Sequence, residues 1–206
     1  METGKVYWAG DLFNFKDLLG NRMLADRFNT LAEGRWQAVL PQDSESNSSR
    51  SQSIRDDDLE LLFSSDAVVA NFDGTDLDSG TVVEFCFAKF LELPTVLLRT
   101  DFRKNGDSAA SNADPWNLMC SGYPGTETIC IHSMMQFRQK SIDQLLVYLA
   151  GEIIRKLDHC SASPRVSTPE EDFAAFVRAV KCAGGSMIER FPEERIKKMI
   201  SRRHYS

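Results

Sequence analysis

Short apolar runs alternate along most of the chain with longer segments whose apolar residues recur three or four positions apart. The runs predict buried strands, at residues 5–10, 36–41, 67–73, 94–100 and 127–133. The segments with helical spacing predict helices, at residues 15–33, 54–66, 80–93 and 141–159. Strands that alternate with helices of this length indicate an α/β fold. We predict one Rossmann- or flavodoxin-like domain with a central parallel sheet flanked by helices.

The pattern changes near residue 158. The stretch "CSASPRVSTPEED" has the composition of a linker, and Thr168-Pro169-Glu170-Glu171 is a good helix start with proline at the first helical position. The segments "FAAFVRAVKCAGG" and "FPEERIKKMISRR" then predict two helices. We therefore expect a principal domain over residues 1–158 and a linker with a helical C-terminal extension over residues 159–206. The extension could close the domain, pack on a neighbouring subunit or be partly ordered.

Two polar stretches interrupt the alternation. Residues 42–53, "QDSESNSSRSQS", contain no core-forming side chain and predict a mobile loop, and residues 101–115 predict a second long loop.

Composition narrows the class of protein. The chain has 206 residues, of which 42% are hydrophobic and 26% charged, and this suits one globular domain. Its net charge of −6 argues against nucleic acid as a partner. The five cysteines are scattered without metal-binding spacing, which is typical of reduced thiols. The N-terminus lacks a signal pattern and no apolar stretch reaches about 18 residues, so we expect a soluble cytoplasmic protein with no membrane partner.

Polar residues gather where the predicted strands end. They occupy positions 7–11, position 42, positions 73–78 and positions 100–101. The carboxyl ends of parallel strands share one edge of a sheet, where ligands of open α/β sheets bind. The sequence therefore predicts a site at this edge.

The stretch "NFDGTDLDSGTVVEFCFAKF", residues 71–90, concentrates acidic side chains at that edge. One interpretation is structural: Thr81 and Glu84 fit a capping box, with Thr81 as N-cap. The other is catalytic: a carboxylate that the helix terminus keeps ionised could attack an anomeric carbon, while Asp78 holds it or binds a sugar hydroxyl. Asp73, Asp76 and Asp78 also allow a metal site, but no fourth oxygen ligand follows. Since no nucleotide-binding glycine fingerprint is present either, we expect neither metal nor cofactor.

Three segments together resemble the nucleoside 2-deoxyribosyltransferase family: "VYWAGDLF", "DGTDLDSGTVVEFCFA" and "PWNLM". Family members carry an Asp six positions before a catalytic Glu, as Asp78 precedes Glu84 here. A further family Asp lies twenty positions earlier, where this chain has Asp58. The resemblance covers roughly residues 4–150, the size of one compact α/β unit.

The resemblance implies a role for each catalytic position. Glu84 corresponds to the nucleophile that forms a covalent 2-deoxyribosyl intermediate, and Asp78 to the residue that orients it and contacts the sugar. Asp58 corresponds to the acid that assists protonation of the base. Tyr7 corresponds to the aromatic hydroxyl beside the nucleophile, which helps to exclude a 2′-hydroxyl. Without the resemblance, Asp58 could equally be a helix N-cap or lie on a solvated face, and Tyr7 could be a buried strand residue.

The resemblance also implies substrate-binding positions. Asn117 matches the asparagine that reaches the 5′-hydroxyl from an adjacent subunit, which implies a homo-oligomer with shared sites. Gln42 is placed near the base, and Gly10 and Asp11 form the turn after the first strand. Asn117 could alternatively satisfy only a turn.

The implied reaction is exchange of the base of a 2′-deoxyribonucleoside for a free nucleobase, a salvage reaction with hydrolysis as side reaction. Both a preference for purines and transfer among all bases stay open. A first alternative is a 2′-deoxynucleoside 5′-phosphate N-hydrolase. Asp11 argues against it, because its charge would repel a phosphate in that turn. A second alternative is a non-catalytic nucleoside-binding module, which would gain nothing from the Asp78 and Glu84 pair.

Overall fold

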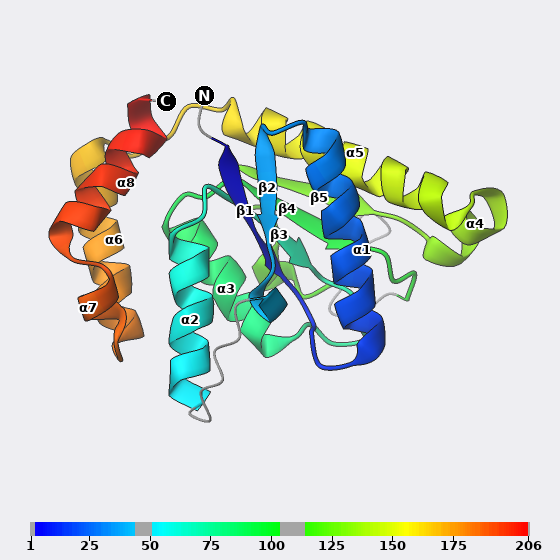
Figure 1. Ribbon diagram of the computed structural model, residues 1–206, viewed down its shortest axis with the longest axis horizontal. Helices are drawn as coiled ribbons and strands as arrows, with labels where there is room; N and C mark the ends of the chain where they lie inside the picture. The colour runs from blue at the N-terminus through cyan, green and yellow to red at the C-terminus, as the bar shows by residue number, and fades with distance from the viewer. Residues whose placement is uncertain (1–2, 44–50, 104–113, 206) are drawn as a thin grey trace.

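The computed structural model describes residues 3–43, 51–103 and 114–205. Five parallel strands form one sheet in the order β2-β1-β3-β4-β5 (Figure 1). The strands are β1 (Gly4–Ala9), β2 (Trp36–Val39), β3 (Ala67–Asn71), β4 (Thr95–Arg99) and β5 (Thr126–Cys130). The strand order reverses between β1 and β3. In open α/β sheets, ligands bind at the point of this reversal.

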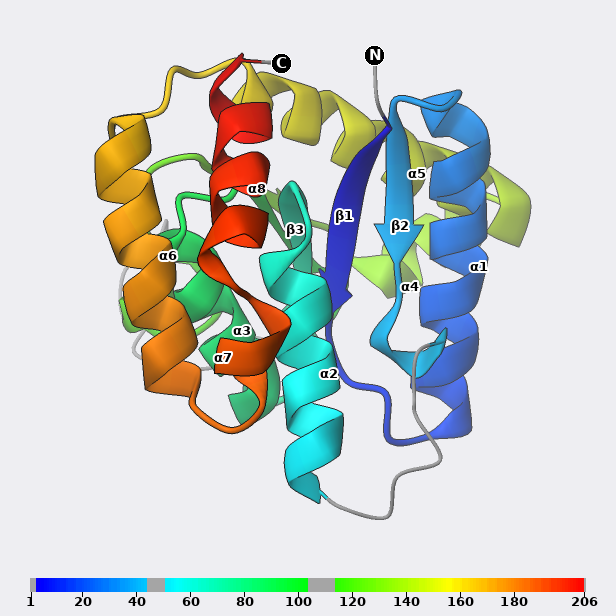
Figure 2. The same cartoon turned by 60° about the vertical axis from the view of Figure 1, so that its left-hand side comes forward.

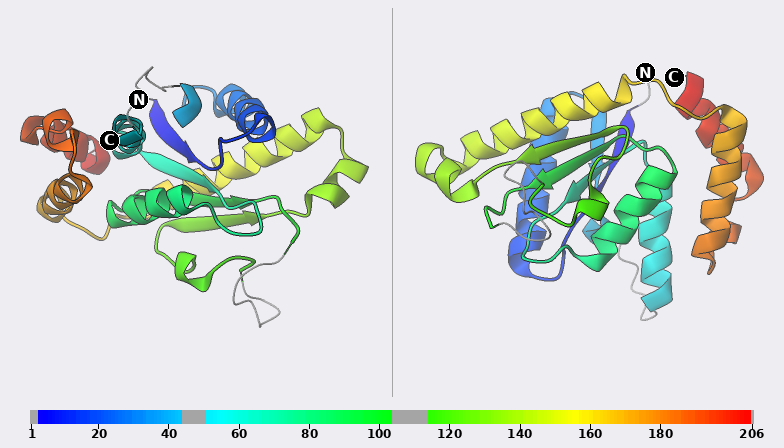
Figure 3. Two further views of the ribbon diagram at one scale, coloured as in Figure 1. Left: turned by 90° about the horizontal axis from the view of Figure 1, so that it is seen from below. Right: turned by 180° about the vertical axis from the view of Figure 1, so that it is seen from behind.

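The central strands β1, β3 and β4 are largely buried because helices cover both faces of the sheet. Helices α1 (Phe15–Ala32) and α5 (Ile142–Ser161) cover one face, while α2 (Ser51–Phe63) and α3 (Ser79–Phe90) lie on the other (Figures 1 and 3). Successive strand side chains point to opposite faces. Val6 and Trp8 therefore belong to the core with α1 and α5, whereas Tyr7 and Ala9 belong to the core with α2 and α3.

The C-terminal extension closes the domain on the α2 and α3 side. It consists of α6 (Pro169–Ala183), α7 (Met187–Arg190) and α8 (Glu193–Tyr205), which lie outside α2 and α3 (Figure 2). Phe63 of α2 packs against Phe176 and Phe191, with ring centroids 5.6 and 5.8 Å apart. One hydrophobic core thus runs from the sheet into the extension, and the first of the three predicted possibilities for the extension holds.

The start of α6 is the one that the sequence predicts. Thr168 is its N-cap, Pro169 its first residue, and Thr168 and Glu171 form a reciprocal capping box. Each side chain accepts a hydrogen bond from the backbone of the other, so this helix start is fixed locally.

Elsewhere the boundaries differ from the prediction. Helix α2 begins at Ser51, inside the stretch predicted as loop. The prediction missed this start because the first turn of α2 is polar and has no apolar periodicity. The rest of that predicted mobile loop is a 3-10 turn η1 (Pro41–Asp43) followed by residues 44–50, which lie outside the described residues, as do residues 104–113 of the second loop. Helix α4 (Ser133–Gln139) was not predicted; it buries no side chain.

The five cysteines are free thiols, of which Cys120 and Cys160 are buried and the other three exposed. Within the described ranges, no helix is long and apolar enough to cross a membrane.

Candidate active site

The site lies where β1 and β3 end and α2 and α3 flank them. Tyr7 of β1 pairs with Val68 of β3, so the turn after β1 runs beside the turn after β3. The turn begins at Gly10, where a Cβ atom would lie 3.0 Å from the Cβ of Asn71. Glycine therefore permits the close approach of the two turns that brings their acidic residues together.

Asp78 is the N-cap of α3. Its carboxylate accepts hydrogen bonds from the backbone N–H and the hydroxyl of Thr81, at 2.7 and 2.9 Å. The helix therefore starts at Ser79, and the capping box with Thr81 as N-cap is wrong. A cap by Asp78 and a capping box of Thr81 with Glu84 both fit the sequence. In the structure Asp78 is the N-cap, and Glu84 lies in the second turn, out of reach of the helix terminus.

Glu84 points to the sheet and meets Tyr7. The Tyr7 hydroxyl donates a hydrogen bond to Oε1 of Glu84 at 2.6 Å, across 77 residues of sequence. Burial raises the pKa of the half-buried Glu84 to about 7, against the lowering effect of the Tyr7 hydrogen bond, and the charges of Asp58 and Asp78 raise it further. The prediction that the helix terminus keeps this carboxylate ionised is wrong, because Glu84 lies beyond the first turn of α3, where the helix dipole has faded, and burial raises its pKa.

Tyr7 is completely buried. Its burial, followed by the negative charges of Glu84 and Asp58, raises its pKa well above 10. The phenol therefore keeps its proton and acts as a permanent donor to one of the two Glu84 oxygens.

Asp58 is the eighth residue of α2, so it is neither the N-cap nor part of the first turn. It is half-buried, and its charge raises the pKa of both Tyr7 and Glu84. The structure thus gathers all four predicted catalytic residues, from three elements: Tyr7, Asp58, Asp78 and Glu84.

Other acids of the segment serve the fold. Asp73 accepts hydrogen bonds from the backbone of Thr100 and Asp101 and from the Thr100 hydroxyl, at 2.5, 2.7 and 2.6 Å. It thereby ties the end of β3 to the end of β4. The described residues contain no group of three side chains placed to bind a metal ion.

Arg99 supports the same loops, although its only signal in the sequence is a cation at the end of an apolar strand. Its guanidinium is 1% exposed and donates to the carbonyl oxygens of Phe72, Gly74 and Arg103. A buried cation thus holds the turn that leads to Asp78.

Asp11 lies in an acidic setting. Burial raises its pKa, and so do the charges of Asp78, Asp17 and Asp73. Gln42 donates through its amide to the carbonyl oxygen of Leu18, at 3.2 Å, which fastens η1 to α1.

Asn117 is apart from these residues. It is exposed and caps a 3-10 turn, η2 (Leu118–Cys120), by accepting from the Met119 N–H at 2.9 Å. It borders a cavity of about 580 Å³ that also contacts Val82, Val83 and Trp116. None of the four gathered residues lines this cavity.

A parallel α/β sheet with acidic side chains gathered near the carboxyl ends of its strands has these groups where α/β proteins of this class bind their ligands. The model of the nucleoside 2-deoxyribosyltransferase family matches residues 6–119, and the chain belongs to this family. Members act on nucleosides and nucleobases.

Several solved structures are similar to the chain at low sequence identity. A conserved protein from Enterococcus faecalis is 22% identical, with a TM-score of 0.52 over 76% of this chain and 98% of its own. A 2-desoxiribosyltransferase from Leishmania mexicana is 18% identical, with a TM-score of 0.48 over 72% of this chain and 97% of its own. A CMP N-glycosidase from Clostridium botulinum is 15% identical, with a TM-score of 0.41 over 70% of this chain and 98% of its own. No curated protein matches the sequence significantly.

Proposed function

We propose that the protein transfers 2-deoxyribose between nucleobases through a covalent intermediate on Glu84. The observation that carries this proposal is the 2.6 Å hydrogen bond from Tyr7 to a half-buried Glu84 that has no capping role. Burial of such a carboxylate lowers the stability of the fold, and ionisable groups buried at this expense are common in active sites.

In the first step an oxygen of ionised Glu84 attacks C1′ of the deoxyribonucleoside while the C1′–N bond breaks. The electron pair of that bond goes to the departing base, which takes a proton from Asp58. In the second step the nitrogen of another base attacks C1′, the bond to Glu84 breaks with its electron pair returning to the carboxylate, and Asp58 takes the proton that the attacking nitrogen loses. Two displacements give net retention, and water in the second step gives hydrolysis.

The remaining positions have supporting roles. Tyr7 holds Glu84 and lies where a 2′-hydroxyl would otherwise fit, and Asp78 holds the start of α3 and contacts the sugar. Gly10 and Asp11 shape the turn, while Gln42 lies near the base. The acidic setting of Asp11 supports a substrate without a 5′-phosphate, because a phosphate would meet the same charges that raise the pKa of Asp11.

Asn117 serves a neighbouring subunit in this proposal. Asn117 is exposed, and none of the four catalytic candidates lines the cavity that it borders. Both observations support a site that is completed across an interface between copies of the chain. Mixing two inactive variants, Glu84→Ala and Asn117→Ala, tests the point. Recovered activity in the mixture supports shared sites, whereas no recovery despite subunit exchange contradicts them.

Base exchange tests the function itself. The protein is incubated with 2′-deoxyinosine and adenine, and deoxyadenosine is followed by chromatography. Glu84→Gln should abolish exchange, and mass spectrometry should detect a deoxyribosylated Glu84 peptide in the wild type alone. Cytosine or thymine as acceptor then tests the purine preference.

Two other results would replace the proposal. Base release from deoxynucleoside monophosphates without exchange would identify an N-hydrolase. Binding of deoxyinosine without turnover would identify a non-catalytic module.

A further inference from the structure

The acidic residues of α2 face in two directions. Asp58 acts on Tyr7 and Glu84, as described above. Asp56, in contrast, is buried against the turn before α7, where it accepts hydrogen bonds from the backbone N–H and hydroxyl of Ser186, both at 2.8 Å. One turn of helix thus joins the site to the C-terminal extension.

Further ion pairs hold the same face of α2. Arg190 of α7 contacts Asp57 at 2.6 Å and Glu60 at 2.9 Å, and Arg195 of α8 contacts Glu60 at 2.7 Å. The Arg190 side chain is only 24% exposed, so its two pairs are partly shielded from water. The turn fits closely as well, because a Cβ atom on Gly185 would lie 2.5 Å from the Asp56 carboxylate.

The extension also holds the C-terminal ends of both helices. Arg203 donates to the carbonyl oxygens of Phe63, the last residue of α2, and of Ser65, two residues later, at 2.9 and 2.8 Å. Arg165 donates to the carbonyl oxygens of Leu91 and Glu92, after the last turn of α3, at 3.0 and 3.3 Å. Guanidinium groups thereby satisfy carbonyl groups that each helix leaves unpaired.

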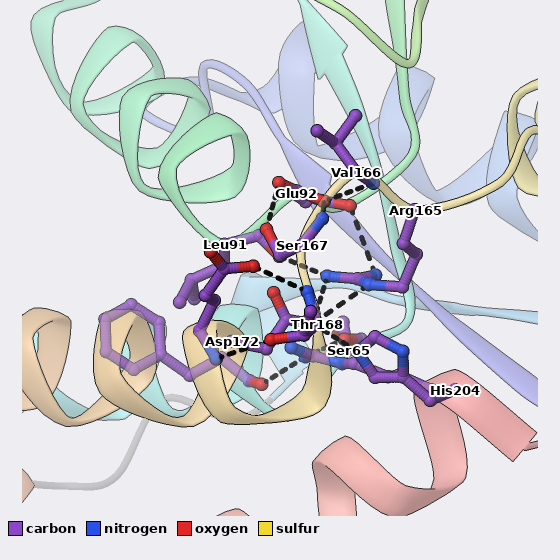
Figure 4. Close-up of polar contacts among 12 residues, drawn as sticks. Ser65, Leu91, Glu92, Arg165, Val166, Ser167, Thr168, Asp172 and His204 are labelled. Carbon is purple, nitrogen blue, oxygen red and sulfur yellow. Dashed lines mark hydrogen bonds and ion pairs between the residues drawn. The ribbon is translucent and has the colours of Figure 1, made fainter.

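The two anchor points are linked within the extension. Asp172 of α6 contacts Arg165 at 2.9 Å and His204 of α8 at 2.8 Å. His204 directly follows Arg203 in the sequence, so the anchor of α2 and the anchor of α3 meet at one carboxylate. Figure 4 shows Arg165, Asp172 and His204 in this group, beside Glu92 and Ser167. Asp172 is 7% exposed, and the network is shielded from water.

We propose that the C-terminal extension is a brace that fixes α2 against α3 and so sets the spacing of Asp58 and Glu84. Ser186 and Arg190 are its positioning residues on α2. The proposal rests on the proposed function, in which Asp58 is the acid and Glu84 the nucleophile. An acid and a nucleophile that act on one bond must hold their separation within a fraction of an ångström, and here they stand on two different helices.

The test compares Arg190→Met with Arg27→Met. Arg27 also pairs with an acid, Asp143, and is partly exposed, but it joins α1 to α5 on the other face of the sheet. Activity is resolved into kcat and KM. We expect Arg190→Met to lower kcat about tenfold with little change in KM, Arg190→Lys to restore most of it, and Arg27→Met to leave it unchanged.

A second readout does not need turnover. The pKa of Glu84 is measured by carbon NMR of the carboxyl groups, with its signal assigned by loss in Glu84→Gln. The groups that act on it are Tyr7 from β1, Asp58 from α2 and Asp78 at the start of α3. Asp58→Asn should lower the pKa of Glu84 when it is introduced into the wild type. Introduced into Arg190→Met, the same substitution should lower this pKa by less than half as much.

An equal shift in both backgrounds, or none in either, would overturn the brace. If Arg190→Met does not fold, Ser186→Ala replaces it, since it removes one hydroxyl and keeps the backbone contact. Absence of base exchange in the wild type would instead overturn the proposed function while leaving the NMR comparison valid.

Discussion

Glu84 acquires its pKa of about 7 from its place in the second turn of α3, where burial outweighs the hydrogen bond from Tyr7. Its pKa in the unfolded chain is near 4.5, so the folded protein binds the proton more tightly. Stability is therefore lost as pH rises between these values. A difference of this size corresponds to about 3 kcal/mol above pH 7.

Glu84→Gln should consequently stabilise the protein in alkaline solution. At pH 8 we expect its free energy of unfolding to exceed that of the wild type by about 1–3 kcal/mol, and at pH 4 the two should agree. Urea titrations at both pH values measure this. A less stable Glu84→Gln at pH 8 would mean that the carboxylate supports the fold.

Tyr7→Phe should move the pH dependence of the reaction. The phenol lowers the pKa of Glu84 by donating to its ionised form, so its removal raises that pKa. In the wild type, kcat/KM should rise with pH through about 7 as Glu84 ionises. In Tyr7→Phe the rise should come at higher pH and the rate at pH 7 should fall several-fold. Identical profiles would exclude Glu84 as the titrating group.

At the scale of elements, Asp78 combines a structural and an electrostatic role that two substitutions separate. Asp78→Asn keeps an oxygen that can accept from Thr81, so we expect stability within about 0.5 kcal/mol of the wild type. It removes a charge that raises the pKa of Glu84, so that pKa should fall. Asp78→Ala loses the cap and should cost about 1–2 kcal/mol in urea unfolding. Equal losses in both variants would show that the charge, rather than the cap, stabilises α3.

The elements themselves were largely predictable, because strands and helices here differ in the period of their apolar residues. Predictions failed where that signal is absent: at the polar first turn of α2, and at α4, which buries no side chain. The cap of α3 was wrong for another reason. Asp78 with Thr81, and Thr81 with Glu84, are both three residues apart, and only packing of Glu84 toward Tyr7 decides between them.

At the scale of the molecule, the sequence predicted a site at the carboxyl edge of the sheet, and the structure brings the four candidate residues together there, but the sequence did not decide where the extension packs. The contacts of Asp56, Asp57 and Glu60 reach about 130 residues along the chain, to Ser186 and Arg190. No periodicity relates acids in one helix to cations in another. Asp56 is thus a buried residue, whose contact with Ser186 replaces water.

The shared core predicts that the α/β body and the extension unfold together. Phe191 of the extension is 3% exposed and packs on Phe63 and Phe176, so Phe191→Ala should cost about 3–5 kcal/mol. Ile188 of α7 is 59% exposed, and Ile188→Ala should change stability little.

Two probes follow the transition. All three tryptophans, Trp8, Trp36 and Trp116, lie in the α/β body, so their fluorescence reports the body, while far-ultraviolet circular dichroism also reports α6 and α8. The two curves should coincide in urea, and in Phe191→Ala both should move together to lower urea. Helical signal lost ahead of tryptophan fluorescence would show an extension that separates first, and an extension that separates first could not hold α2 against α3.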